Sequence, residues 1–205
     1  MLAHFYHVYA DGAWEAPVDE HLHALTVSGL LDSLDDLFVG IVGLPENRAS
    51  VKKRFPAVVI AEADTGWEQL TLAKLHEYAM NHEGKIFYAH TKGAHQPDEY
   101  RSQWRKAMTH DTVTRWRDCV DALNFVGVAG PYWMESQEPE HKDHQKFFGG
   151  NYWWARTNYL RALPPVGMEH RWQAEGWIGL AGPSVKIMRE GVPTWGNFEV
   201  PRVVV

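Results

Sequence analysis

Several features that define whole classes of protein are scarce or missing in this sequence. There is one cysteine, Cys119, which excludes a disulfide bond within the chain and gives no sign of an oxidising compartment. No stretch approaches the roughly 20 apolar residues that a membrane span requires. The first residues lack the basic region and apolar run of a secretion signal. We therefore expect a cytoplasmic protein without a membrane span.

Positive charge is also scarce. The chain has 20 Lys and Arg against 26 Asp and Glu, a net charge of −6 with neutral histidines. General nucleic-acid binders usually carry a basic face, so the composition argues against that class without excluding a local basic patch. Aromatic side chains are abundant instead, with 10 Trp beside 12 His. Aromatic rings can bind sugars or bases, but they fill cores equally well.

Short apolar runs alternate with segments of helical periodicity along the chain. We predict strands over His4–Ala10, Leu37–Val42, Ala57–Ala61, Lys85–Ala89, Phe125–Ala129 and Gln145–Ala155. We predict helices around Val18–Gly29, Pro45–Phe55, Gly66–Asn81, Pro97–Leu123 with a break near Thr109–Asp111, and Glu169–Ile178. This alternation is typical of an α/β fold with a mostly parallel central sheet flanked by helices. We expect a single domain over residues 1–205, with an irregular tail from 183 to 205.

Polar clusters follow three of the predicted strands, at Tyr9–Gly12, Glu62–Thr65 and His90–Gly93. In such sheets ligands bind beyond the carboxyl ends of the strands. In the third cluster, Thr91 and Lys92 can hold phosphate oxygens, and Gly93 lets the backbone approach a ligand closely. The alternative is a plain exit from the strand with a solvated lysine.

A second motif combines Gly149, Gly150 and Asn151 with the pair Trp153 and Trp154. Paired glycines inside a strand mark either a bulge or the close approach of a ligand. Asn151 could then offer its amide to hydroxyl groups, with the tryptophans as a stacking wall. The alternative is a bulged core strand in which both tryptophans only pack.

Two further groups of titratable residues have competing interpretations. Glu175 lies between apolar neighbours near a helix end, where partial burial could make it a general base. Its alternative is a structural ion pair with Arg171, four residues earlier. His141 and His144 resemble a metal-binding pair, but we favour a polar loop because two further ligands are lacking.

These motifs occur in an order that resembles a family of small bacterial and phage glycosyltransferases with a GT-A-like fold. The resemblance runs from about His4 to Gly179 and rests on "FYAHTKG", "QWRKAM", "FGGNYWWA" and "AEGWIG". More distantly, the His-Thr-Lys element is similar to proteins assigned to rhamnose-rich polysaccharide synthesis. A phage origin would place the protein in the cytoplasm of the host.

The resemblance implies transfer of a sugar from a nucleotide-diphosphate sugar to an acceptor hydroxyl, with inversion. Residues from 1 to about 95 would form the nucleotide-binding half, and residues 96–182 the half for the donor sugar and acceptor. Glu175 would be the catalytic base. The donor-binding set would be Tyr9, Ala10, Thr71, His90, Thr91, Lys92, Gly93 and Arg105, with Arg105 facing the diphosphate or supporting the His90 loop. The sugar and acceptor pocket would be Gly149, Gly150, Asn151, Trp153, Trp154 and Trp177.

Enzymes of this fold commonly hold a divalent metal with an Asp-x-Asp motif, and His90-Thr91-Lys92 takes that place here. Lys92 could stabilise the leaving diphosphate directly, which puts the need for Mg²⁺ or Mn²⁺ in doubt. Glu62 and Asp64 would be the fallback metal ligands. The acceptor could be a glycan, a protein or a modified base in phage DNA. A non-catalytic module that binds carbohydrates or nucleotide-sugars is the rival from another class, and the sequence leaves the oligomeric state open.

Overall fold

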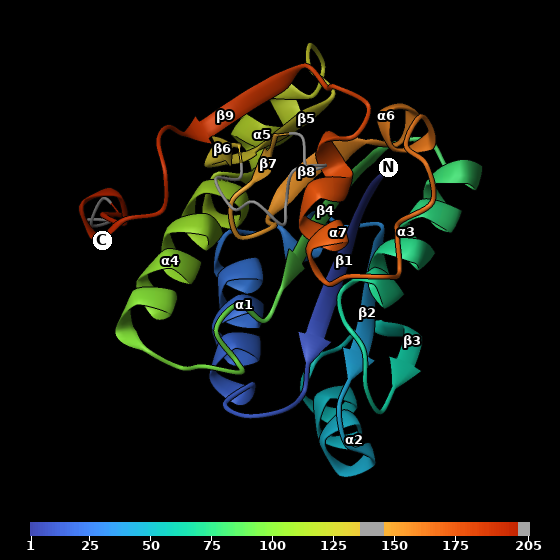
Figure 1. Ribbon diagram of the computed structural model, residues 1–205, viewed down its shortest axis with the longest axis vertical. Helices are drawn as coiled ribbons and strands as arrows, with labels where there is room; N and C mark the ends of the chain where they lie inside the picture. The colour runs from blue at the N-terminus through green and yellow to red at the C-terminus, as the bar shows by residue number, and fades with distance from the viewer. Residues whose placement is uncertain (136–145, 201–205) are drawn as a thin grey trace.

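A seven-stranded sheet forms the centre of the computed structural model, which describes residues 1–135 and 146–200 (Figure 1). The strand order is β3-β2-β1-β4-β8-β5-β9. β8 is antiparallel to both of its neighbours, and all other neighbouring strands are parallel. The strands are β1 (Leu2–Tyr9), β2 (Asp36–Val42), β3 (Val58–Ala63), β4 (Lys85–His90), β5 (Val128–Pro131), β8 (Trp153–Arg156) and β9 (Val185–Arg189). The predicted α/β fold with a mostly parallel sheet is confirmed.

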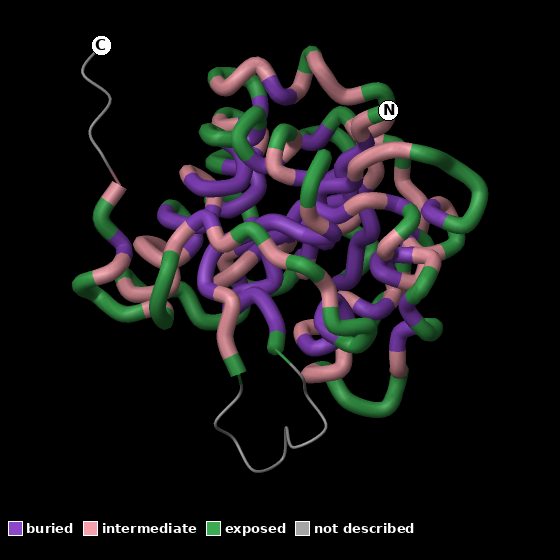
Figure 2. The backbone as a smooth tube through the Cα atoms, turned by 90° about the horizontal axis from the view of Figure 1, so that it is seen from above, coloured by how far each residue is buried: buried purple, intermediate pink, exposed green. Residues whose placement is uncertain are grey.

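Helices cover both faces of this sheet. One face carries α1 (Glu15–Val27), α2 (Pro45–Arg54), α4 (Glu99–Thr109) and α5 (Trp116–Ala122), and the other carries α3 (Gln69–Asn81), α6 (Thr157–Arg161) and α7 (Trp172–Gly176). Alternation along β1 supplies both cores, because Phe5 packs with the second group while Tyr6 and Val8 pack with the first. The buried chain accordingly lies in the middle of the molecule (Figure 2). No helix within the described residues is long and apolar enough to cross a membrane.

The predicted break in the long helix is confirmed and has a clear cause. A π-helical turn, η2 (His110–Thr114), separates α4 from α5 and places Asp111 in the interior. There Asp111 Oδ2 accepts a hydrogen bond from Arg189 Nε at 2.6 Å. This ion pair fixes the end of β9, which runs parallel to β5. Within the tail from 183 onward, which we expected to be irregular with short extended pieces, β9 is one such piece and joins the sheet as an edge strand.

Two strand predictions need correction at their ends. The chain at Phe125 continues the turn of α5, since its N–H donates to Ala122 O at 2.9 Å, and its side chain is exposed. β5 therefore begins only at Val128. The predicted strand Gln145–Ala155 is split into β7 (Phe147–Phe148) and β8, and β7 pairs with β6 (Trp133–Met134) in a separate small sheet. Left-handed backbone at Gly150 and Asn151 interrupts the extended run.

The helix predicted over Glu169–Ile178 is shorter than expected. The Gln173 side-chain oxygen accepts hydrogen bonds from the N–H groups of Glu169 and His170 at 2.9 and 3.2 Å. These bonds satisfy the two amides outside the helix, so α7 begins only at Trp172. Its last turn tightens into the 3₁₀ segment η4 (Trp177–Gly179). Two other 3₁₀ turns are η1 (Leu31–Ser33) and η5 (Trp195–Asn197).

Candidate functional site

The loops that follow β1 and β4 are joined at the carboxyl edge of the sheet. Thr91 Oγ1 accepts a hydrogen bond from the Tyr9 amide at 2.8 Å, and the Thr91 amide donates to His7 O at 3.0 Å. Thr91 is buried, so its hydroxyl serves this junction. The two polar clusters predicted after these strands therefore lie side by side.

Arg105 supports the His90–Gly93 loop from its position on α4. Its Nη1 donates to Lys92 O at 2.8 Å, and its Nε and Nη2 donate to Glu20 Oε2 at 3.0 and 2.8 Å. The side chain is buried on α4. Of the two roles expected for Arg105, these contacts correspond to support of the loop. Gly93 adopts φ +87°, and a Cβ there would lie 3.1 Å from Arg101 Cβ, so this turn suits glycine.

Lys92 is a partly buried cation held at the end of β4. Its ammonium lies 4.0 Å from the centre of the Trp104 ring. Burial lowers the pKa of Lys92, while the carboxylates of Glu175 and Glu68 oppose that shift. Two guanidinium groups, from Arg171 and Arg101, lower the pKa further. Charges of both signs therefore surround this position, and the Lys92 ammonium itself is the cation that could bind an anionic ligand.

His90 is fixed beside Lys92 by contacts on both sides of its ring. Nε2 lies 3.0 Å from Gly150 O, and Nδ1 lies 3.5 Å from Glu68 Oε1. Burial and, next, the charge of Lys92 lower the pKa of His90 to about 3. The imidazole is therefore neutral near pH 7. Because a carbonyl can only accept, its single proton lies on Nε2 and is donated to Gly150 O.

Glu68 connects these residues, although nothing in the sequence marked it. It lies directly before α3, and its Oε2 accepts hydrogen bonds from Tyr88 Oη at 2.8 Å and Asn151 Nδ2 at 2.7 Å. A glutamate at the start of a helix is common for dipole reasons alone, so its position gave no functional signal. Only the fold, which sets the residue before α3 beside β4 and the turn before β8, brings Glu68 to His90.

Asn151 is a structural connector within this site. Its Nδ2 also lies 3.4 Å from Ala174 O, and its Oδ1 accepts a hydrogen bond from Trp153 Nε1 at 2.8 Å. Its backbone is left-handed, with φ +57°. The amide that the sequence suggested for sugar hydroxyl groups is thus occupied by protein partners.

The three tryptophans expected to line a sugar pocket belong to the core. Trp153 and Trp154 are 0% exposed and Trp177 is 1% exposed. Trp154 Nε1 donates to Thr112 O at 2.9 Å, and Trp177 Nε1 donates to Pro164 O at 2.8 Å. A buried ring with a paired N–H offers no face to a ligand, so in this structure the stacking wall is replaced by core packing.

The paired glycines before Asn151 also have a packing explanation. Gly150 has φ +88°, and a Cβ on it would lie 2.4 Å from Met108 Sδ. A Cβ on Gly149 would lie 2.8 Å from Met134 Sδ. Close approach is therefore required here, as the motif predicted, but the neighbour that approaches is protein. Gly150 also supplies the carbonyl that His90 contacts.

Glu175 faces the same site from α7. It is partly exposed, and its charge acts on Lys92, His90 and Tyr88. Figure 1 shows α7 in front of β1 and β4, on the face of the sheet that also carries α3. The Arg171 guanidinium, four residues earlier, lies 3.9 Å from the centre of the Trp172 ring. The role predicted for Glu175 stays a prediction, and the structure adds that its charge reaches Lys92 and His90.

The other residues expected to contact the nucleotide are Tyr9, Ala10 and Thr71, and only the first of them has a partly exposed side chain. The Tyr9 ring is partly exposed and meets His95 edge-on, with the ring centres 6.0 Å apart. Ala10 is buried, with its carbonyl held by Asn47 Nδ2 at 2.8 Å. Thr71 is also buried and its Oγ1 lies 2.8 Å from His7 Nδ1, so it packs under the site.

The fallback metal ligands are both engaged with α2. Glu62 Oε1 lies 2.7 Å from Lys52 Nζ, and Asp64 Oδ1 lies 2.8 Å from Arg48 Nη1. Across residues 1–135 and 146–200, no group of three or more His, Cys, Asp or Glu side chains is arranged to hold a metal ion. Glu62 and Asp64, each paired with a basic side chain of α2, therefore do not fit a metal centre. His141 and His144 lie outside the described residues.

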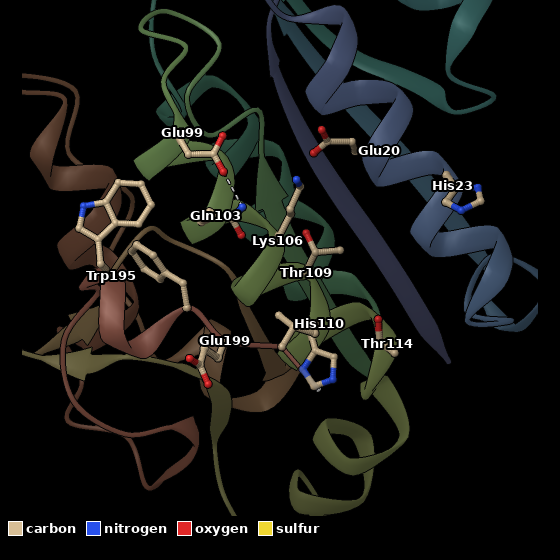
Figure 3. A pocket seen from close by; sticks show the side chains of 12 residues that line it. Glu20, His23, Glu99, Gln103, Lys106, Thr109, His110, Thr114, Trp195 and Glu199 are labelled. Atoms are coloured by element: carbon tan, nitrogen blue, oxygen red, sulfur yellow. Dashed lines mark hydrogen bonds between the residues drawn. The ribbon is translucent and has the colours of Figure 1, made fainter. Parts of the chain in front are cut away.

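A cavity of about 650 Å³ lies away from this site, between α1, α4, η2 and the segment after β9 (Figure 3). Its lining includes Trp195 and Phe198 beside Glu20, Lys106 and His110. Glu20 also accepts hydrogen bonds from Arg105, so the same carboxylate borders the cavity and holds the residue that supports the Lys92 loop. None of the residues predicted for the site lines this cavity.

Comparison with solved structures finds proteins with a similar fold. The structure of a 4-diphosphocytidyl-2C-methyl-D-erythritol synthase from Anaerococcus prevotii DSM 20548 superposes with a TM-score of 0.50, at 6% identity, over 98% of this chain and 92% of that chain. A putative nucleotide-diphospho-sugar transferase from Desulfovibrio desulfuricans G20 gives a TM-score of 0.49, at 12% identity, over 90% of this chain and 78% of that chain. At these identities the likeness concerns the fold alone.

The family itself follows from the sequence match. Residues 5–175 match a family described as a domain of unknown function, DUF8361, and the chain belongs to that family. No curated protein matches the chain.

Proposed function

We propose that this protein is a glycosyltransferase that moves a sugar from a nucleotide-diphosphate sugar to a hydroxyl group of a polysaccharide or protein. The observation that carries the proposal is that Lys92 follows the carboxyl end of β4, the edge where ligands bind in such sheets, and that the charge of the Glu175 carboxylate reaches it and opposes the lowering of the pKa of Lys92 by burial. A cation beside a carboxylate matches the two needs of such a transfer, which are a leaving diphosphate and an acceptor proton.

The residues divide the reaction between them. Lys92, with Arg171, stabilises the negative charge that grows on the leaving diphosphate. Glu175 takes the proton from the acceptor hydroxyl as that oxygen attacks the anomeric carbon. The bond between that carbon and the diphosphate oxygen breaks, and the nucleoside diphosphate leaves with the electron pair. Attack opposite the leaving group inverts the anomeric configuration. The steps assigned here are carried by side chains of this chain alone, and Lys92 takes the place that a divalent metal would have beside the diphosphate.

The test is to incubate the protein with UDP-glucose, GDP-mannose and TDP-glucose and a mixture of bacterial glycans, and to measure free nucleoside diphosphate. Release that depends on an added glycan supports the proposal. A protein that binds one of these donors and releases nothing is a binding module. A parallel incubation with EDTA tests whether release of the nucleoside diphosphate requires a divalent metal ion. We expect release to survive chelation, and loss that Mn²⁺ restores would overturn the role given to Lys92.

The rival functions lose part of their support in the structure. A carbohydrate-binding module built on Trp153, Trp154 and Trp177 needs exposed rings, and these rings are buried. A DNA acceptor would need free basic groups such as those of the run Lys52–Arg54, but Lys52 binds Glu62 and Arg54 Nη1 lies 2.6 Å from Asp19 Oδ2. We therefore rank a modified-DNA acceptor below a polysaccharide or a protein.

A further inference from the structure

Two hydrogen-bond acceptors face each other between α3 and β4. Glu68 Oε1 and His90 Nδ1 are 3.5 Å apart. The other carboxylate oxygen of Glu68 is occupied by the Tyr88 hydroxyl and the Asn151 amide, and the other ring nitrogen of His90 contacts Gly150 O. Because Gly150 O requires the ring proton on Nε2, Nδ1 carries a lone pair toward the carboxylate.

Two acceptors pointing at each other repel unless a donor joins them. The protein's nearby cation does not, because the Lys92 ammonium lies over the Trp104 ring instead. The side chains of His90 and Glu68 are 13% and 16% exposed, so neither is sealed from solvent. Their remaining atoms are held by buried partners, so the pair cannot easily turn away from the repulsion. The arrangement suits an incoming hydrogen-bond donor.

We propose that Glu68 and His90 form a subsite that binds a hydroxyl group of the donor sugar. This inference rests on the proposed function, because it places the sugar next to the diphosphate that Lys92 would hold. A hydroxyl fits better than an ammonium group, since the Lys92 ammonium already supplies a positive charge that acts on His90. A hydroxyl brings a donor without a further charge.

The substitution Glu68→Gln tests the subsite without removing its supports. The side-chain oxygen of the amide can still accept from Tyr88 and Asn151. Its NH₂ group would face His90 Nδ1 and donate a hydrogen bond to it, so the protein itself would supply the donor that the subsite otherwise takes from a ligand. Glu77→Gln is the matched control, since Glu77 lies on the same helix in a surface pair with Lys74 at 2.8 Å.

The measurement is the dissociation constant of each protein for UDP and UDP-glucose, GDP and GDP-mannose, and TDP and TDP-glucose, together with the melting temperature. In the unmodified protein we expect one sugar-linked nucleotide to bind about ten- to hundredfold more tightly than its parent diphosphate, as a hydrogen bond to a charged acceptor allows. Glu68→Gln should lose that difference while keeping its affinity for the diphosphate, and its melting temperature should not fall.

Three results would overturn the subsite, and they differ from failure of the proposed function. In the first, Glu68→Gln keeps the preference for the sugar-linked nucleotide. In the second, it loses affinity for both nucleotides equally. In the third, its melting temperature falls by many degrees, which would make the carboxylate a structural group. If no nucleotide of the panel binds the unmodified protein, the proposed function itself fails and the subsite falls with it.

Discussion

The Lys92 ammonium lies 4.0 Å from the centre of the Trp104 ring, so an aromatic face holds the cation that we assign to the diphosphate. The same ring packs against the turn before β8, because a Cβ on Gly150 would lie 3.1 Å from Trp104 Cε2. Trp104 thus connects two parts of the site that are distant in the sequence. Its indole nitrogen is buried and has no hydrogen-bond partner. Only the ring is used.

Because the indole nitrogen makes no hydrogen bond, substitutions of Trp104 should report on the contribution of its aromatic ring alone. A cation–π contact at a partly exposed site is worth about 0.5–1 kcal/mol, so Trp104→Leu should weaken binding of a nucleoside diphosphate about two- to fivefold. Trp104→Phe keeps a ring and should lie between that variant and the unmodified protein. Isothermal titration with UDP, GDP and TDP measures the order. Equal affinity of all three proteins would show that the ring does not position Lys92.

Asn151 offers a test of the connector at the centre of the site. Asn151→Ala removes the contacts to Glu68, Trp153 and Ala174 and leaves a side chain in left-handed backbone. We expect a loss of roughly 2–4 kcal/mol in the free energy of unfolding. Asn151→Gly loses the same contacts without the backbone cost, so it should be more stable than the alanine variant by about 1 kcal/mol. Urea unfolding measures both, and the reverse order would contradict this account of the turn.

A part of this molecule can be predicted from sequence when its signal lies in neighbouring residues of the chain. Strands β1, β2 and β4 have nearly continuous apolar runs, and a parallel strand buried on both faces needs little else to be recognised. The break near His110 was also readable from the polar residues that interrupt the helical pattern. The end of α5 misled the prediction, because Phe125 is apolar but exposed, so composition alone placed a strand where the helical turn continues.

The site was predictable to the extent that it follows strand ends. His90, Lys92 and Glu175 carry visible chemistry in motifs, and the charges of Lys92 and Glu175 both act on His90. Glu68 and Trp104 were missed because their roles depend on contacts between elements far apart in the chain. The tryptophans were misassigned for the same reason, since an exposed aromatic and a core aromatic look alike in a sequence.

A buried histidine pair gives the protein a predictable dependence on pH. His4 Nε2 lies 2.8 Å from His21 Nε2, and burial lowers the pKa of His4 from 6.5 to about 3 and that of His21 well below 6.5. The unfolded chain therefore binds more protons than the folded chain between about pH 6.5 and pH 3. The contribution of this pair to stability is full above pH 6.5 and falls on acidification, by about 2 kcal/mol for His4 at pH 5 and by a further amount for His21.

Chemical unfolding at pH 8, 6 and 5 measures this slope. His21→Gln removes one of the titrating groups, so its stability should fall less steeply with acid, whatever its stability at pH 8. His95→Gln, at an exposed position, is the control and should keep the original slope. An unchanged slope for His21→Gln would mean that this pair does not carry the acid sensitivity.

Glu175 should matter for the chemical step more than for donor binding. Loss of a general base usually costs about 10²–10⁴ in rate. Glu175→Gln should therefore lower turnover by that factor and change the dissociation constant of the donor less than threefold, on the order of 0.6 kcal/mol. Stopped assays of nucleoside diphosphate release and separate titrations give the two numbers. Unchanged turnover would remove Glu175 as the base.

The most direct measurement concerns Lys92 itself, because the whole account places an anionic diphosphate at the end of β4. Lys92→Met keeps an apolar stem on the Trp104 ring and removes the charge, and Lys186→Met on β9 is the exposed control. For the nucleoside diphosphate that binds the unmodified protein, the account predicts at least a tenfold loss of affinity with Lys92→Met, as expected when a charge-assisted contact is removed, and none with the control. Equal affinity of the two variants would contradict the account.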